Sequence, residues 1–269
     1  MTAVHLLAGV GDLNRRVARR LLERKHSVVG LRRREAEPEL GFEQRSMDLA
    51  QSAWPDVSAD TVIVALSAAE RTADGYRRAY VEPIKRLAES LDGWQQPPRR
   101  VLVVSSSRVY GADDGRQLDE TSAPDPDGWA GATLLEMEQR LADLPVTTVV
   151  ARLSGIYGPG RDWLRRQARQ ADSQPPARNH WTNRIHIEDA AAALVHLALD
   201  VEQPQDCYLV TDRQPTPLFE VLKYLRELEG LPLLADTLSV GGGKQLSSER
   251  LADSGFRWQY PDYRAGGYR

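Results

Sequence analysis

Two glycines near the N-terminus, Gly9 and Gly11, stand where the apolar run VHLLAG (4–9) gives way to a stretch with helical spacing. A turn of this kind lets backbone N–H groups and the positive end of a helix approach a pyrophosphate. The pattern G-x-G-x-x-G is filled at two of its three glycine positions, with Asn14 at the third. Two interpretations follow: a dinucleotide-binding turn, or a plain strand-to-helix turn in which Asp12 caps the helix.

Three consecutive arginines, Arg32, Arg33 and Arg34, end the second apolar run, VVGLR (28–32). An NAD site usually offers a carboxylate to the ribose hydroxyls at this place, whereas guanidinium groups suit a 2′-phosphate. NADP is therefore the favoured cofactor, with NAD as the second option. The alternative is a solvated basic face, which we expect for the arginines of the preceding helical stretch, residues 13–24.

Short runs rich in Val, Ile and Leu alternate with longer stretches of helical spacing along the first half of the chain. This alternation indicates an α/β fold, a doubly wound parallel sheet covered on both faces. The predicted strands are 4–9, 28–32, 60–67, 100–107 and 146–154, and the predicted helices are 13–24, 76–91 and 129–141.

The pattern changes after Ser154, where Gly/Pro-rich turns and the polar loop SQPPARNH (173–180) interrupt further helical stretches. We therefore predict a dinucleotide-binding Rossmann domain over residues 1–154. Residues 155–269 are predicted to be interwoven segments that complete the sheet and form a small substrate lobe. The helices predicted in this part are 163–170, 187–199 and 217–230.

The composition excludes several classes of partner. The net charge of −3, from 35 basic and 38 acidic residues, gives no global attraction for nucleic acid, and the six scattered tryptophans form no stacking platform. No apolar run approaches the roughly 20 residues that a bilayer requires, so we expect no membrane span, no signal peptide and a cytoplasmic location. Cys207 is the only cysteine. It cannot form an internal disulfide, and no Cys/His cluster predicts a metal site.

The order and spacing of several motifs resemble the extended short-chain dehydrogenase/reductase superfamily, in its NAD-dependent epimerase/dehydratase group. More narrowly, the chain is similar to the atypical bacterial YeeZ-type branch, whose Tyr-Pro-Asp ending resembles residues 260–262. The motifs are the glycine turn, Met47-Asp48-Leu49, VVSSSRVYG (103–111), ARLSGIYGPGR (151–161), RIHIEDAAAAL (184–194) and SSERLADSGFRW (247–258).

The resemblance implies a catalytic role for Ser106, beside a substrate carbonyl or hydroxyl. The catalytic Tyr-x-x-x-Lys pair of the superfamily falls here on Trp129 and Thr133. Tryptophan exchanges no proton near neutral pH and threonine brings no positive charge, so the usual mechanism is absent at these positions.

Two explanations for the missing pair stay open. Another titratable group has taken over, with Tyr157 as the first candidate beside Tyr110 and His186, although each also has an ordinary structural interpretation. Alternatively, the chain is a non-catalytic cofactor-sensing or partner-binding module in which Trp129 blocks the nicotinamide pocket. A decayed cofactor site is a third interpretation, under which replacing Asn14 by glycine would raise dinucleotide affinity.

The resemblance also assigns the remaining site residues. Asn183 and Arg184 precede the His-Ile-Glu-Asp segment and are the predicted substrate contacts, with Arg184 suited to an anion. The substrate itself is not identified, and a homodimer through the helices at 76–91 and 129–141 is one option. The predicted cofactor-binding residues are Gly9, Gly11, Asp12, Leu13, Arg32, Arg33, Asp48, Leu49, Ala65, Leu66, Ser67 and Ser105.

Overall fold

The computed structural model describes residues 2–172, 176–234 and 238–268, so three residues of the predicted polar loop lie outside it. The chain forms two compact units. The first unit contains residues 1–110, 126–152 and 191–208, and the second contains residues 111–125, 153–190 and 209–269. Each unit is described by itself below.

A seven-stranded sheet with the order β11-β7-β5-β4-β1-β2-β3 forms the centre of the first unit. The pairings of β1 with β2 and β4, of β2 with β3 and of β4 with β5 are parallel, which confirms the predicted Rossmann-like α/β fold. The strands are β1 (Val4–Ala8), β2 (Ser27–Arg32), β3 (Glu43–Ser46), β4 (Thr61–Val64), β5 (Arg100–Ser106), β7 (Thr147–Leu153) and β11 (Cys207–Val210).

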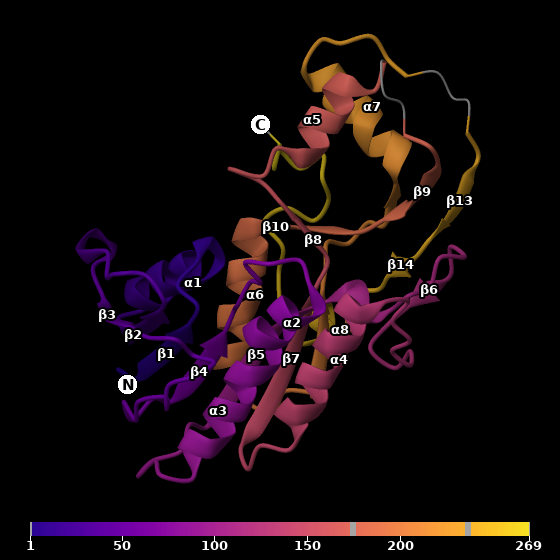
Figure 1. Cartoon of the computed structure of the whole chain (residues 1–269). Coiled ribbons are helices and arrows are strands. Elements are labelled where there is room, and N and C mark those ends of the chain that lie inside the picture. The colour runs from indigo at the N-terminus through magenta and orange to yellow at the C-terminus, as the bar shows by residue number, and fades with distance from the viewer. Residues whose placement is uncertain (1, 173–175, 235–237, 269) are drawn as a thin grey trace. The chain divides into compact units, whose positions relative to one another are not determined.

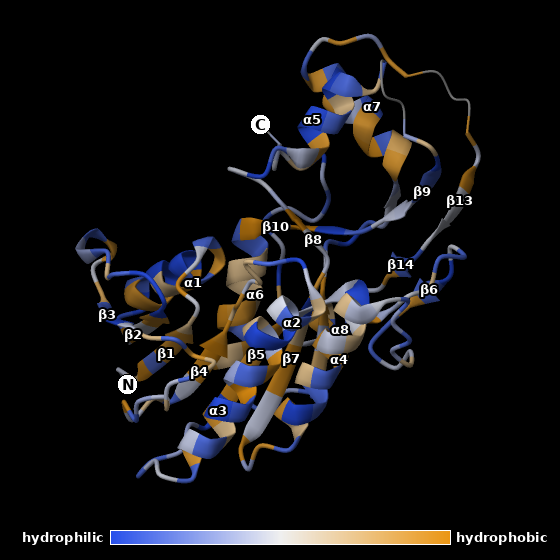
Figure 2. Cartoon of the chain, viewed as in Figure 1, coloured by the Kyte–Doolittle hydropathy of each residue, from blue (hydrophilic) through white to orange (hydrophobic). Residues whose placement is uncertain are grey.

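The strands predicted from apolar runs are all present, because such runs can be buried on both faces of a parallel sheet. Leu6, Ile63 and Leu102, one from each of three neighbouring strands, are fully buried. Figure 2 shows the hydrophobic residues concentrated on these strands. Two strands of this sheet were not predicted. The edge strand β3 has the polar sequence EQRS, and β11 is short, with the four residues CYLV.

Helices cover both faces of this sheet (Figure 1). On one face lie α1 (Asp12–Glu23) and α6 (Ile187–Leu199), whose C-terminal ends are joined by an ion pair of 2.8 Å between Arg24 and Asp200. The other face carries a continuous helical segment and α4 (Trp129–Ala142). That segment consists of α2 (Ala73–Tyr76), a π-helical turn (Arg77–Val81) and α3 (Glu82–Leu91).

The second unit is built around a helix pair, α5 (Trp163–Gln170) and α7 (Leu218–Leu228), which packs on buried aromatic residues. The predicted helices at 163–170, 187–199 and 217–230 are thus confirmed. The short strands are β6 (Gln117–Leu118), β8 (Gly155–Tyr157), β9 (Asn179–Thr182), β10 (Arg184–His186), β12 (Thr216–Pro217), β13 (Val240–Gly243) and β14 (Gln245–Leu246), and a last helix is α8 (Glu249–Asp253).

In the described parts of the chain, no helix combines the length and the apolar character needed to cross a bilayer.

Candidate functional site

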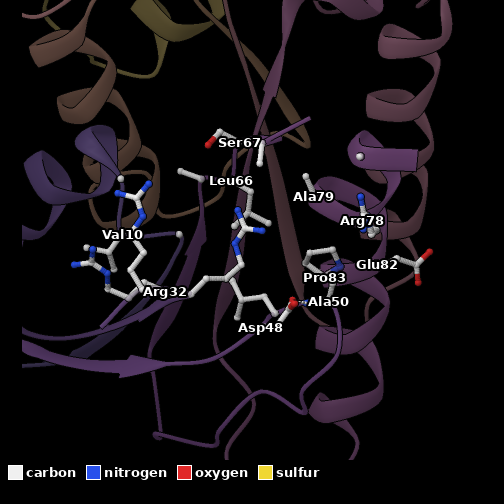
Figure 3. Close-up of a pocket in the computed structure, with 18 of the residues that line it drawn as sticks. Val10, Arg32, Asp48, Ala50, Leu66, Ser67, Arg78, Ala79, Glu82 and Pro83 are labelled. Atoms are coloured by element: carbon white, nitrogen blue, oxygen red, sulfur yellow. Dashed lines mark hydrogen bonds between the residues drawn. The ribbon is translucent and has the colours of Figure 1, made fainter. Parts of the chain in front are cut away.

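A cavity of about 540 Å³ opens in the first unit between the glycine turn, the ends of β2 and β4, and the π-helical turn. Arg32 lies across this cavity from Arg78 and Glu82 (Figure 3). Of the residues predicted to bind a dinucleotide, Gly9, Gly11, Ala65, Leu66 and Ser67 line the part near β1 and β4, and Arg32, Arg33, Asp48 and Leu49 line the part near β2 and β3. Asp12, Leu13 and Ser105 do not line it.

The two glycines of the turn have different physical requirements. Gly9 has a φ of +85°, and a Cβ there would lie 2.4 Å from the carbonyl oxygen of Ala65, so only glycine fits. Gly11 is the N-cap of α1 in extended conformation, and a Cβ there would meet nothing within 4 Å. Open space therefore lies over the N-terminus of α1, where the helix dipole favours an anion.

Asn14, at the third position of the glycine pattern, is fully buried. Its Nδ2 donates hydrogen bonds to the carbonyl oxygens of Ala8 (3.0 Å) and Gly9 (3.1 Å), so its side chain holds the turn in place. Asp12 does not line the cavity, and its carboxylate accepts a hydrogen bond of 3.0 Å from Arg16, one helical turn away. The carboxylate of Asp12 is thus partly neutralised by an ion pair with its own helix.

Four arginines line one end of the cavity: Arg32, Arg33 and Arg34, which the sequence singled out, and Arg15. Sequence reasoning assigned Arg15 to a solvated face. It lies four residues after Gly11 and therefore on the same side of α1, a spacing that would have identified it. Arg15 and Arg32 both pair with the carboxylate of Glu37, and the hydrogen bond from Arg32 lowers the pKa of Glu37.

Asp48 follows β3 and shapes the floor of the cavity. Its Oδ1 accepts a hydrogen bond from the backbone N–H of Ala50 (3.0 Å), and its Oδ2 accepts one from Gln51 (3.2 Å). The opposite wall comes from the π-helical turn, where Arg78 pairs with Glu70 at 2.8 Å. Sequence reasoning missed this wall, because apolar spacing does not distinguish a π-helical turn from the surrounding α-helix.

Ser105 belongs to a buried polar network. Its hydroxyl donates a hydrogen bond of 2.5 Å to Glu138, whose carboxylate also accepts hydrogen bonds from Arg152 at 2.6–3.2 Å. Arg152 in turn donates to the hydroxyl oxygen of Tyr110 at 2.5 Å. Burial opposes the charge of Arg152, but the hydrogen bond and charge of Glu138 outweigh it and raise the pKa of Arg152. Ser105, at the end of β5, and Tyr110 are thereby fixed in the interior.

Ser106, Trp129 and Thr133 are held by local contacts. The hydroxyl of Ser106 accepts a hydrogen bond of 3.2 Å from the backbone of Arg108, which caps a 3₁₀ turn at residues 107–109. Trp129 begins α4, is 46% exposed and meets the ring of Tyr76 edge-on at 4.9 Å. Thr133 donates its hydroxyl proton to the carbonyl oxygen of Trp129 (2.8 Å), so its side chain stays on its own helix.

The remaining candidate acid or base groups lie in the second unit. Tyr157 is 2% exposed and donates its hydroxyl proton to the carbonyl oxygen of Asp262 (3.3 Å). Burial raises the pKa of Tyr157 well above its usual range, so its phenol stays protonated at neutral pH. His186 is also buried, and its Nδ1 accepts a hydrogen bond of 3.2 Å from the backbone of Glu188. Its ring centre lies 3.8 Å from that of Tyr260.

The two predicted substrate contacts make structural hydrogen bonds in the second unit. Asn183 donates to the carbonyl oxygen of Lys244 (2.8 Å) and accepts from the backbone of Leu246 (2.9 Å), which fixes β14. Arg184 is 2% exposed, and its Nη2 donates to the carbonyl oxygen of Thr182 (3.3 Å). Its Nη1 is buried without a hydrogen-bond partner in the described structure.

No group of three or more metal-binding side chains converges in the described ranges of the chain.

Residues 2–206 match the sequence pattern of the RmlD substrate binding domain. The chain belongs to this family. A related structure, of a candidate NAD-dependent epimerase/dehydratase from Methylobacillus flagellatus, is 36% identical, with a TM-score of 0.86 over 99% of this chain and 96% of that one. The resemblance to the NAD-dependent epimerase/dehydratase group of short-chain dehydrogenases is thereby confirmed. A search of curated proteins found no match.

More distant structures share the fold of the RmlD-type chain. The human epimerase family protein SDR39U1, solved with NADPH, is 17% identical, with a TM-score of 0.77 over 97% of each chain. MoeE5, solved with UDP-glucose and NAD, is 22% identical, with a TM-score of 0.75 over 97% of this chain and 95% of MoeE5. The fold is therefore that of NAD(P)-binding epimerases and dehydratases.

Proposed function

We propose that this RmlD-type chain binds NADP(H) in the cavity of its first unit. The observation that carries the proposal is a group of four arginines at one end of the cavity, while the glycine turn lines another part of it. The arginines are Arg15, Arg32, Arg33 and Arg34. The open space over Gly11 suits a pyrophosphate at the N-terminus of α1. The arginines then take the 2′-phosphate of the adenosine ribose, and Asp48 and Leu49 adjoin the adenine.

NAD is the less favoured cofactor. An NAD site needs a carboxylate that is available to the ribose hydroxyls near the end of β2. The carboxylate of Glu37 is paired with two arginines and does not line the cavity. The basic lining therefore supports the phosphorylated cofactor.

A thermal-shift titration of the purified protein with NADPH, NADP, NADH and NAD tests this function. A ligand at ~100 times its dissociation constant adds about 2.7 kcal/mol to the free energy of unfolding. We expect NADPH and NADP to raise the melting temperature more than NADH and NAD. Equal shifts for all four, or no shift with any, contradict the NADP(H) assignment.

Two charge-reversed variants sharpen the comparison. Arg33 is exposed, lines the cavity and makes no ion pair in the described structure, so Arg33→Glu should weaken NADPH binding more than NADH binding without unfolding the protein. Arg19→Glu is the matched control, because Arg19 is an equally basic position on α1 that does not line the cavity. Equal loss of NADPH and NADH in Arg33→Glu contradicts a phosphate contact.

The reaction lineage is oxidoreductase, and a bound nicotinamide cofactor would supply or accept a hydride. Ser106 is the proposed contact to a substrate carbonyl or hydroxyl, with Tyr157 as the proposed substitute acid and Arg184 and Asn183 as proposed contacts to an anionic substrate. A second function is a cofactor-sensing or partner-binding module without hydride chemistry. It is favoured because the hydroxyl groups of Tyr110, Thr133 and Tyr157 are all engaged in hydrogen bonds within the protein.

Turnover separates these two functions. NADPH consumption on a panel of carbonyl compounds and sugar nucleotides supports an enzyme, whereas dinucleotide binding without turnover on the whole panel supports the module. The sequence-based expectations of a cytoplasmic location and of a homodimer through the helices at 76–91 and 129–141 remain proposals.

A further inference from the structure

The carboxylate of Glu37 is held between two of the arginines that line the cavity. Arg32 Nη2 lies 2.5 Å from its Oε1, and Arg15 Nη2 lies 2.6 Å from its Oε2. Arg15 comes from α1 and Arg32 from the end of β2, so one anionic group bridges two separate elements. Glu37 itself does not line the cavity. Two guanidinium groups converging on one carboxylate form a ready-made oxyanion site, occupied by the chain's own side chain.

The backbone and the carboxylate of Glu37 are held by different partners. Gln44 of β3 accepts a hydrogen bond from the backbone N–H of Glu37 (3.1 Å) and donates one to its carbonyl oxygen (2.7 Å). The same Gln44 accepts a hydrogen bond from Arg32 (3.0 Å). The backbone at Glu37 and the guanidinium of Arg32 therefore stay in place when the carboxylate turns away.

The ion pair of Glu37 with Arg15 is of the kind that another anion can replace. The side chain of Glu37 is 28% exposed and that of Arg15 is 40% exposed, so water and salt reach the contact with Arg15, whereas the side chain of Arg32 is 6% exposed. Partly exposed ion pairs contribute little and are screened by salt. A phosphate dianion has more charge and more acceptor oxygens than a carboxylate and competes well for two guanidinium groups. Arg33 and Arg34, which make no ion pair in the described structure, supply further positive charge beside it.

We propose that Glu37 is the intramolecular occupant of the 2′-phosphate subsite, and that NADP(H) binds by displacing its carboxylate from Arg15 and Arg32. This inference rests on the proposed function and adds the residue that sets its selectivity. While Glu37 stays in place, it neutralises part of the basic end of the cavity and weakens the preference for the phosphorylated cofactor. Removing its charge leaves two guanidinium groups for the ligand alone.

Two nucleotide fragments test the inference without any enzymatic assay. Dissociation constants for 2′,5′-ADP and 5′-AMP are measured by calorimetry for the wild type and Glu37→Gln. Glu39→Gln is the control, because Glu39 is an exposed acid two residues away, in the 3₁₀ turn Pro38–Leu40 that follows Glu37. We expect Glu37→Gln to bind 2′,5′-ADP about fivefold more tightly, with 5′-AMP unchanged, which is the upper size of an exposed charge-pair effect. Glu39→Gln should leave both constants unchanged.

A second probe separates the subsite from the cofactor. Inorganic phosphate should raise the melting temperature of Glu37→Gln more than that of the wild type or Glu39→Gln, because the emptied guanidinium pair accepts it. If phosphate stabilises Glu37→Gln but neither nucleotide binds, the result supports the oxyanion subsite and contradicts the proposed function. Nucleotide binding in which Glu37→Gln has no effect on 2′,5′-ADP overturns the inference and leaves the proposed function standing.

Two further outcomes also decide the question. If Glu37→Gln weakens 5′-AMP, the carboxylate serves as a ribose acceptor in an NAD site, and the displacement is wrong. If neither phosphate nor any nucleotide affects either protein, both the subsite and the proposed function are overturned.

Discussion

The side-chain amide of Asn14 donates a hydrogen bond of 3.1 Å to the carbonyl oxygen of Gly9. The same amide donates to Ala8 at 3.0 Å, and the asparagine is fully buried. At this position a dinucleotide-binding turn usually has a glycine that lets helix and strand pack closely. Here the asparagine replaces close packing by two hydrogen bonds that hold the turn, so the departure from the pattern stabilises the turn instead of disrupting it.

Replacing Asn14 by glycine should therefore weaken the protein without improving the site. The carbonyl oxygens of Ala8 and Gly9 lose a buried donor, which costs roughly 1–3 kcal/mol of unfolding free energy. Dinucleotide affinity should stay equal or fall. Chemical denaturation and a cofactor titration check both parts, and a marked gain in affinity would instead support a decayed site.

Alanine at Gly9 should mainly lower stability, and alanine at Gly11 should mainly lower dinucleotide binding. Gly9→Ala forces a Cβ to 2.4 Å from the carbonyl oxygen of Ala65 at a φ of +85°, so we expect a loss of at least about 2 kcal/mol of unfolding free energy. Gly11→Ala meets open space and should cost no more than about 1 kcal/mol, while its methyl group reduces dinucleotide binding. Melting temperatures with and without NADPH measure both effects. A Gly11→Ala variant that binds NADPH as the wild type does places the pyrophosphate elsewhere.

Two glutamates of α4 provide a matched pair for the buried network. Glu138→Gln leaves the guanidinium of Arg152, 7% exposed, without its carboxylate, and should cost about 3–5 kcal/mol. Glu136→Gln removes partly exposed ion pairs with Arg77 and Arg140 and should cost about 1 kcal/mol. Urea denaturation of the two variants gives the comparison. Similar small losses would show that the Glu138 network is not a major contributor to stability.

Asp212 should make the stability of the protein depend on pH. Burial raises its pKa to about 7, whereas the unfolded chain loses this proton near its ordinary value of 3.8. Between these values the native state holds more protons than the unfolded state, so stability falls as pH rises from about 4 to about 7, by an amount of the order of 3 kcal/mol.

Asp212→Asn removes this titration and should flatten the pH dependence between pH 4 and 7. Asp253→Asn is the control, since Asp253 is exposed at the end of α8. Urea denaturation at pH 5 and pH 8 is the measurement. If the free energy of unfolding falls from pH 5 to pH 8 as much in Asp212→Asn as in the wild type, Asp212 is not the cause of the pH dependence.

Much of the fold follows from local sequence patterns. The apolar runs at 60–67 and 100–107 predict strands, because a strand buried on both faces needs no polar positions. The strand β3, with the sequence EQRS, was missed because an edge strand is specified by pairing with its neighbour, not by its own hydrophobicity. The motif order also predicted the family, since the motifs mark the turns of one fold.

The sequence by itself determined the alternation of strands and helices and the glycine turn, because each is a property of residues that lie close together in the chain. Only the tertiary structure decided that Ser105 bonds Glu138, 33 residues away, instead of lining the cavity. It also decided that Arg15 and Arg32 meet over Glu37. Such contacts depend on how separate elements pack and on which buried polar groups must find partners, and neither can be read from residue spacing.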